Sequence, residues 1–290
     1  MAQNVMVIGL GYMGAALAHT LINNSYSVTV WNRTAAKAES LVNAGADFSE
    51  SVETGVAANE IIVLCLSTYQ DCYEVLEECV DLTGKTIIQL TTASVDQAQE
   101  MASWAKDRKA DYLDGAIIAY PSGVGSAASM LIMGGDLTAW ERCEAIVKAL
   151  GPASRYMGTD VAIPASLDFA MIFVGLVSQL AVIQGYHLLE DSDLSADAYA
   201  DFVAPLFSQG VGAGLRKSLA AIEQDDFTRV EASIKTWSTA ISHAGDTGSV
   251  SKNTALIDAV QAMLRGAIDA GEGDRGLDSM IRYMRQSRAG

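Results

Sequence analysis

The sequence is short of positive charge. Its 290 residues include 19 Lys and Arg against 35 Asp and Glu, and the formal net charge is −16. Nucleic acid and anionic membranes would repel such a surface, so neither is expected as a partner. This charge does not forbid a local basic pocket that holds a phosphate.

Long hydrophobic runs are missing too. The most apolar stretch, 169–177, is about nine residues long, whereas a bilayer span needs roughly 20. This stretch therefore predicts a buried helix. The N-terminus carries no basic leader and enters a strand at once, which predicts a cytoplasmic protein without a signal peptide.

Cysteine and histidine are scarce. The four cysteines show no paired metal spacing, and the three histidines lie far apart in the sequence. In a chain with a large core, such cysteines are typical of reduced, buried thiols in the cytosol. No metal site is expected.

What the sequence does have is enough apolar residues for a large core, at 50% hydrophobic, and a length that suggests two domains. Its first half alternates apolar strand candidates with helical patterns such as 14–23 and 35–44, and Ser94 with Gln97 forms a capping box. This alternation predicts an α/β domain of the Rossmann type with a parallel sheet covered on both faces. The strand candidates are 5–10, 27–32, 60–66, 86–91, 111–118 and 129–135.

The pattern changes after Gly158. Pro164 suits the first turn of a helix, and 167–189 is apolar nearly all round, so this helix must be covered by two domains or by another subunit. We expect a dinucleotide-binding domain at 1–158, an interdomain helix at 159–190 and an all-helical domain at 191–290. Helices of that last domain are expected at 196–207, 212–223, 228–243, 256–270 and 277–288.

The segment GLGYMG indicates a dinucleotide site. Gly9, Gly11 and Gly14 have the G-x-G-x-x-G spacing, and the segment follows a strand and opens a helix. Such glycines permit a tight turn, close approach to a pyrophosphate and close helix packing. An ordinary glycine turn is the alternative. The intervening Leu10, Tyr12 and Met13 belong to the same predicted site.

The end of the second strand candidate favours NADPH over NADH. An NAD site usually places Asp or Glu there to accept a hydrogen bond from the ribose 2′-hydroxyl. Here Asn32 is followed by Arg33, Thr34 and, one turn later, Lys37. A guanidinium, a hydroxyl and an amine suit a 2′-phosphate. The alternative is a solvated charge beside a threonine helix cap.

Two further strand ends should face the same crevice, because ligands of open α/β sheets bind outside the carboxyl ends of the strands. Cofactor contacts and simple turn or cap roles remain equally open for these residues. They are Leu66, Ser67 and Thr68 after the third strand candidate, and Thr91 and Thr92 after the fourth.

Asp168 is the candidate catalytic residue. It lies past the first turn of the apolar helix, where help from the helix dipole has faded. Burial would raise its pKa from about 3.9 and make it a usable proton donor near neutral pH. The alternative is a carboxylate at an exposed edge or helix cap. No Lys or Arg occurs between Arg155 and Arg216, so this helix offers no clamp for a substrate carboxylate and suits a cationic amine or iminium.

The chain resembles the imine reductases, a branch of the β-hydroxyacid dehydrogenase superfamily, over nearly its whole length. The segments that carry the resemblance are GLGYMG, VTVWNRT with Lys37, WAKDRKADYLDGAIIAYP, the pair Gly134 and Gly135, and LDFAM. It implies NADPH-dependent reduction of a C=N bond, typically in cyclic imines and sometimes after an amine and a ketone condense. Asp168 stands where the parent dehydrogenases carry a catalytic lysine.

The resemblance also implies a domain-swapped homodimer, in which the long helix and the helical bundle of one chain complete the active site of the other. Ile118, Ala119 and Leu176 are expected to line the substrate pocket, with Trp237 from the partner chain. Two alternatives remain. A β-hydroxyacid dehydrogenase would need the missing lysine and a carboxylate clamp, and a non-catalytic NADPH-binding sensor or scaffold would use the fold alone.

Overall fold

The computed structural model describes residues 4–79, 81–243 and 254–286. The chain divides into two compact units, Met1–Phe173 and Val174–Gly290. The division falls inside the long helix α7 (Ala162–His187), because the first turns of α7 pack on the first unit. The finer partition into 1–158, 159–190 and 191–290 stays a prediction.

The first unit is built on one eight-stranded sheet with the order β3-β2-β1-β4-β5-β6-β7-β8. The order reverses between β1 and β4. The strands are β1 Asn4–Ile8, β2 Ser27–Trp31, β3 Asp47–Phe48, β4 Ile61–Leu64, β5 Thr86–Gln89, β6 Asp111–Ile118, β7 Met130–Gly135 and β8 Arg155–Tyr156.

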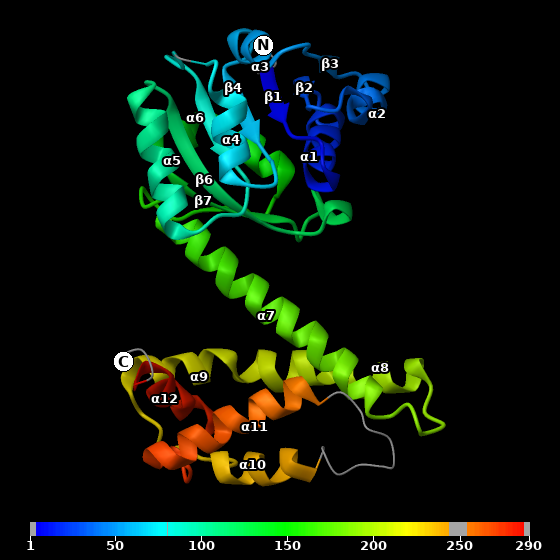
Figure 1. Ribbon diagram of the computed structural model, residues 1–290, viewed down its shortest axis with the longest axis vertical. Helices are drawn as coiled ribbons and strands as arrows, with labels where there is room; N and C mark the ends of the chain where they lie inside the picture. Colours follow the sequence, from blue (N-terminus) through cyan, green and yellow to red (C-terminus); the bar gives the residue numbers. More distant parts are fainter. Residues whose placement is uncertain (1–3, 80, 244–253, 287–290) are drawn as a thin grey trace. The chain divides into compact units, whose positions relative to one another are not determined.

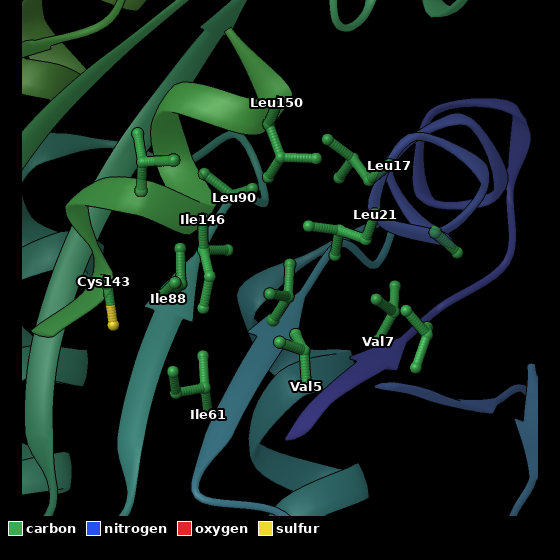
Figure 2. Close-up of a cluster of buried hydrophobic side chains, with 14 of the residues drawn as sticks. Val5, Val7, Leu17, Leu21, Ile61, Ile88, Leu90, Cys143, Ile146 and Leu150 are labelled. Atoms are coloured by element: carbon green, nitrogen blue, oxygen red, sulfur yellow. The ribbon is translucent and has the colours of Figure 1, made fainter. Parts of the chain in front are cut away.

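Helices cover both faces of this sheet (Figure 1). One face packs against α1 (Tyr12–Asn23) and α6 (Leu137–Leu150), and Figure 2 shows this core, with side chains such as Leu17 and Ile146 lying against the strands. The other face packs against α3 (Val52–Ala58), α4 (Tyr69–Leu76) and α5 (Val95–Asp107). Strands buried on both faces explain the nearly continuous apolar runs in the sequence. The remaining helical segments of the unit are η1 Ala35–Ala38, α2 Glu39–Asn43 and η2 Pro121–Gly123.

The predicted parallel sheet is confirmed, and one of its strand pairs, β6 with β7, is antiparallel. A parallel pair needs a crossover of a dozen or more residues, usually with a helix. Only residues 119–129 separate these two strands, and they hold no helix longer than η2. The sheet is therefore mostly parallel. The capping box at Ser94 and Gln97 is confirmed at the start of α5.

The second unit is helical, with a small core formed by Ile234, Leu264, Ala267 and Met280. The helix expected at 228–243 begins only at Ile234, because Thr228 lies in a turn closed by Asp226 and Ser233 caps the helix. The end of the helix expected at 277–288 lies outside the described residues. The segments are α8 Ala196–Pro205, η3 Leu206–Val211, α9 Gly212–Gln224, α10 Ile234–Ser242, α11 Ala255–Ala267, η5 Ile268–Glu272, η6 Leu277–Ser279 and α12 Met280–Gln286.

α7 differs from the buried helix expected from the sequence. Its buried residues are Pro164, Ala165 and Asp168, whereas large apolar side chains such as Phe173 and Val174 are 67% and 64% exposed. By length and composition alone it could cross a membrane, with a mean hydropathy of 2.0 over 18 residues. One such helix is weak support for a membrane protein, and an apolar helix left uncovered in one chain fits an interface equally.

Candidate functional site

The loop between β1 and α1 holds the three glycines that the sequence predicted to bind a dinucleotide. Gly9 has a φ of +97°, and a Cβ there would meet the Cys65 carbonyl oxygen at 2.3 Å. A Cβ on Gly14 would lie 1.9 Å from the Gly9 carbonyl oxygen. The Cβ position of Gly11 has no atom within 4 Å, so its backbone is open to an approaching group.

The N-terminus of α1 lies in this loop and has the features of an anion site. α1 begins at Tyr12 with Gly11 as its N-cap, and its first turn contains no acidic residue. The first amides of a helix have no acceptor within it, and the helix dipole makes this end positive. The loop also lies where the strand order reverses, the place where open α/β sheets bind ligands. A pyrophosphate therefore fits here.

Gly14 and Gly11 provide a matched pair of variants. We expect Gly14→Ala to lower the free energy of unfolding by about 1–3 kcal/mol, because its Cβ would force α1 away from the loop. Gly11→Ala should change stability by less than about 0.5 kcal/mol, yet weaken dinucleotide binding by narrowing the approach to the backbone. Urea denaturation and cofactor titration measure the two effects, and equal destabilisation by both variants would contradict the assignment.

The basic residues after β2 are free to bind a phosphate. Arg33, Thr34 and Lys37 are exposed, and neither cation is paired within the described part of the chain. Asn32 has a different part, because its Oδ1 accepts a hydrogen bond from the Leu10 amide at 2.9 Å and its Nδ2 donates to the Thr34 carbonyl at 3.0 Å. Asn32 therefore holds the two loops together.

A single cavity of about 870 Å³ joins these loops, within the roughly 300–1,000 Å³ typical of cofactor sites. Most of the residues predicted to bind the cofactor line it. They are Gly9, Leu10, Gly11, Tyr12, Met13, Gly14, Asn32, Arg33, Thr34, Lys37, Leu66 and Ser67.

The other three predicted threonines, Thr68, Thr91 and Thr92, are not among the residues that line this cavity. Thr68 caps α4, and its hydroxyl accepts from the Asp71 amide at 3.1 Å. Thr91 is buried and its hydroxyl accepts from the Leu66 amide at 3.0 Å, which holds the loop after β4. Thr92 is exposed and is hydrogen-bonded to Asp168. The structure thus gives Thr68 the capping role that the sequence left open.

Acidic residues on the cavity wall were missed by the sequence interpretation. They come from the loop before α3 and from α4 and its end: Glu50, Asp71, Glu74, Glu77 and Glu78. The signal was present, since residues 71, 74 and 78 recur at the spacing of one helix face. Among the residues that line the cavity, the cations Arg33 and Lys37 both lie beside β2.

Asp168 is a buried carboxyl, with 7% of its surface exposed. Burial raises its pKa, and the hydrogen bond from the Thr92 hydroxyl opposes that rise in part. Thr92 lies in the loop that follows β5, so the acid stands near a carboxyl end of the sheet. A carboxyl of this kind can hold a proton at a pH at which an exposed aspartate has lost it.

The residues predicted to line the substrate pocket fall in both units. Ile118 and Ala119 are half-buried at the end of β6. Leu176 is exposed in the part of α7 that belongs to the second unit, and Trp237 on α10 lines a cavity of about 280 Å³ within that unit. Across the described residues, no three His, Cys, Asp or Glu side chains gather as metal ligands, and Cys65, Cys72, Cys79 and Cys143 are free.

The fold and the cavity define a dinucleotide-binding domain followed by a helical domain, an architecture typical of oxidoreductases. Residues 4–158 match the family described as the NAD binding domain of 6-phosphogluconate dehydrogenase, and residues 160–286 match the NADPH-dependent reductive aminase-like C-terminal domain. With these two domains in one chain, the protein belongs to the family of imine reductases and reductive aminases.

Individual relatives match over nearly the whole chain. An NADPH-dependent reductive aminase from Aspergillus oryzae is 29% identical over 296 residues, which cover 98% of each protein. The imine reductase from Myxococcus stipitatus in complex with NADP+ superposes with a TM-score of 0.89 at 28% identity, covering 97% of this chain and 99% of that one. A reductive aminase from Aspergillus terreus with NADPH and ethyl-5-oxohexanoate has a TM-score of 0.90 at 25% identity, covering 98% and 100%.

Proposed function

We propose that this chain reduces the C=N bond of imines to give amines, with NADPH as the hydride donor and cyclic imines as its main substrates. The observation that carries the proposal is Asp168, a buried carboxyl on α7 in a chain that has both domains of the family. The chain is an NADPH-dependent oxidoreductase, as are the relatives that match it end to end. Condensation of a ketone with an amine before reduction is a further capacity of the same site.

The cavity between β1, β2 and β4 holds NADPH in this proposal. Arg33 and Lys37 bind the 2′-phosphate together with the Thr34 hydroxyl, and the N-terminus of α1 binds the pyrophosphate. When bound, NADPH supplies a hydride to the imine carbon. Asn32 holds the β2 loop against Leu10, so this residue orients the site from within the protein.

Asp168 completes the reaction at nitrogen. Reduction of an imine adds a hydride to carbon and a proton to nitrogen, and a carboxyl that keeps its proton near neutral pH can supply the latter. After transfer, the carboxylate stabilises a cationic iminium or amine by its charge. The absence of Lys and Arg between Arg155 and Arg216 fits such a substrate and leaves a hydroxy acid without a cation from this segment.

The pocket beside the nicotinamide is formed by Ile118 and Ala119 of one chain with Leu176 and the partner's Trp237. This proposal requires a homodimer with shared active sites. The support for a homodimer is a set of large apolar side chains exposed on α7, α8 and α9. Without a second chain to cover them, these side chains would be in contact with water. Burial of α7 against a second copy also favours a cytoplasmic enzyme over a membrane protein.

The dimer is tested by a charge placed on α7. We expect the wild-type chain to sediment with the mass of two chains rather than the 30.6 kDa of one. Phe173→Asp, at a side chain 67% exposed in the single chain, should shift it to monomers and abolish turnover, because a buried unpaired charge costs several kcal/mol. Ser166→Asp, exposed on the same helix, is the control. A dimeric Phe173→Asp variant would contradict the proposed interface.

The reaction is tested by following NADPH consumption with 2-methyl-1-pyrroline, beside oxidation of a short 3-hydroxy acid with NADP+. Turnover of the imine without oxidation of the hydroxy acid is the expected result. Oxidation of the hydroxy acid alone would make the chain a β-hydroxyacid dehydrogenase. Tight NADPH binding without either reaction would favour a sensor or scaffold that uses the fold alone.

A further inference from the structure

A second buried carboxyl lies in the first unit and has no part in the function proposed above. Asp114, on β6, is 3% exposed. Its Oδ2 accepts hydrogen bonds from the hydroxyl of Tyr69 on α4 at 2.5 Å and from that of Tyr112 at 2.9 Å. Both tyrosines are buried, and burial raises their pKa values, so they act as neutral donors.

Within the described part of the chain, no cation compensates the charge of Asp114. The charged or titratable groups that act on it are Tyr69, Tyr112 and Asp168, and no Lys or Arg of the described residues is among them. Cys72, which lies one turn after Tyr69, acts on that tyrosine and is not among the groups that act on Asp114. Burial raises the pKa of Asp114 to about 6; the two tyrosine hydrogen bonds lower it and the charge of Asp168 raises it. A carboxyl in this state keeps its proton at a higher pH than an exposed aspartate does.

The strand register places Asp114 beneath the start of α7. Asp114 pairs with Gly134 across the antiparallel β6–β7 ladder, so the two residues face the same side of the sheet. A Cβ on Gly134 would lie 2.7 Å from the Asp160 carbonyl oxygen and 3.1 Å from Pro164. The first turn of α7 therefore lies directly on this side of the sheet, and the missing side chain of Gly134 permits the close approach.

Asp168 shares that helix face. It follows Pro164 by four residues, and side chains at this spacing lie one above the other. Helical side chains also lean towards the helix N-terminus, which directs Asp168 back to the region that Pro164 covers. The Thr92 hydroxyl, on the loop after β5, is its hydrogen-bond donor, and the Asp160 side chain caps the first turn at the Ala162 amide.

The charge of Asp168 therefore acts on Asp114, and no Lys or Arg of the described residues is among the groups that act on either carboxyl. Like charges so placed oppose each other's ionisation, and the last proton to leave belongs to the pair rather than to either residue. The neighbour of Asp114 on the other side is Gln89, opposite it in the β5–β6 register. Gln89 is fully buried, and its Nε2 has no hydrogen-bond partner among the described residues. Its side chain is a neutral amide, so it adds no positive charge beside Asp114.

We propose that Asp114 is a positioning residue for Asp168: the two carboxyls form a pair that holds one proton between them at a pH at which an exposed aspartate is ionised, and Tyr69 and Tyr112 fix Asp114 in that pair. The inference rests on the proposed function for the use of the proton, since Asp168 passes it to the imine nitrogen. After this transfer, the carboxyl pair takes up a new proton from solvent. Asp114 itself contacts neither substrate nor cofactor in this account.

The pair is tested first without any substrate, by infrared difference titration of the protonated carboxyl band in the full-length protein. We expect the upper midpoint of wild type to lie about one pH unit or more above that of Asp114→Asn and also above that of Asp168→Asn, because each variant removes the opposing charge. Tyr69→Phe removes a donor to the ionised form of Asp114 and should move the midpoint upward. Tyr73→Phe, on the same helix and without that bond, is its control.

The catalytic readout follows from the same variants. In Asp114→Asn, the pH at which the turnover number for 2-methyl-1-pyrroline falls on the alkaline side should move down with the infrared midpoint. If Asp114→Asn fails to fold, the reciprocal shift in Asp168→Asn and the upward shift in Tyr69→Phe still test the pair. An unchanged midpoint in folded Asp114→Asn or Asp168→Asn overturns the inference. Coupled infrared midpoints without imine turnover would keep the pair and remove the proposed function instead.

Discussion

Asp168→Ala is expected to lower the turnover number for imine reduction by about 10²–10⁴-fold, the range that a positioned general acid contributes. The carboxyl is buried, is hydrogen-bonded to Thr92 and has a raised pKa. The variant therefore loses the proton for the imine nitrogen, and it also loses the negative charge that the carboxylate carries after proton transfer. Asp168 lies on α7 and outside the glycine-loop cavity. NADPH affinity should therefore stay within about twofold of wild type.

Asp168→Asn separates the proton from the shape of the side chain. It keeps the volume and the hydrogen bond with Thr92 but has no acidic proton, so its turnover should resemble that of Asp168→Ala. Asp107→Ala, an exposed acid on α5, controls for the change in net charge. Unchanged turnover in Asp168→Ala with intact NADPH binding would remove this residue from the mechanism.

The pH dependence of the wild type follows from the same burial. A group whose pKa is raised keeps its proton to a higher pH and loses it as the pH rises through the raised value. Turnover that needs this proton should fall on the alkaline side of that value. In Asp168→Ala the alkaline fall due to this group should disappear, which steady-state rates over a pH series would show.

Local patterns in the sequence predicted the parts of the site that lie close together along the chain. The glycine loop and the residues after β2 are each a few residues long, and each follows a strand whose apolar run is easy to recognise. Asp168 stood out because a charged residue interrupts an apolar helix. In all three cases the chemistry is visible in one segment, because the backbone geometry that the chemistry needs is local.

The features that the sequence did not predict depend on contacts between segments that are distant along the chain. The hydrogen bond from Tyr69 to Asp114 joins residues 45 positions apart, and no periodicity marks either of them. The antiparallel direction of β7 is set by its short link to β6, not by the composition of the strand itself. The exposure of α7 likewise cannot be read from its apolar residues, since those indicate only that something must cover them.

Arg33→Ala is expected to raise the KM for NADPH by about 10- to 100-fold. A hydrogen bond to a charged group contributes about 1.5–3 kcal/mol, and about 1.4 kcal/mol corresponds to a factor of ten. Arg33 is exposed on the cavity and unpaired within the described residues, so the variant loses only what the guanidinium gives to a ligand. The KM for NADH, which has no 2′-phosphate, should change by less than about threefold.

Comparing the two cofactors distinguishes a phosphate contact from general attraction. The acidic residues on α4 lower the potential of the whole cavity, so loss of any nearby cation weakens both cofactors to some extent. Lys106→Ala, which removes an exposed cation on α5, reports that general effect. Arg33→Lys keeps the charge but not the forked donors, and an intermediate KM for NADPH is expected. Equal increases for NADPH and NADH in Arg33→Ala would show that Arg33 does not bind the 2′-phosphate.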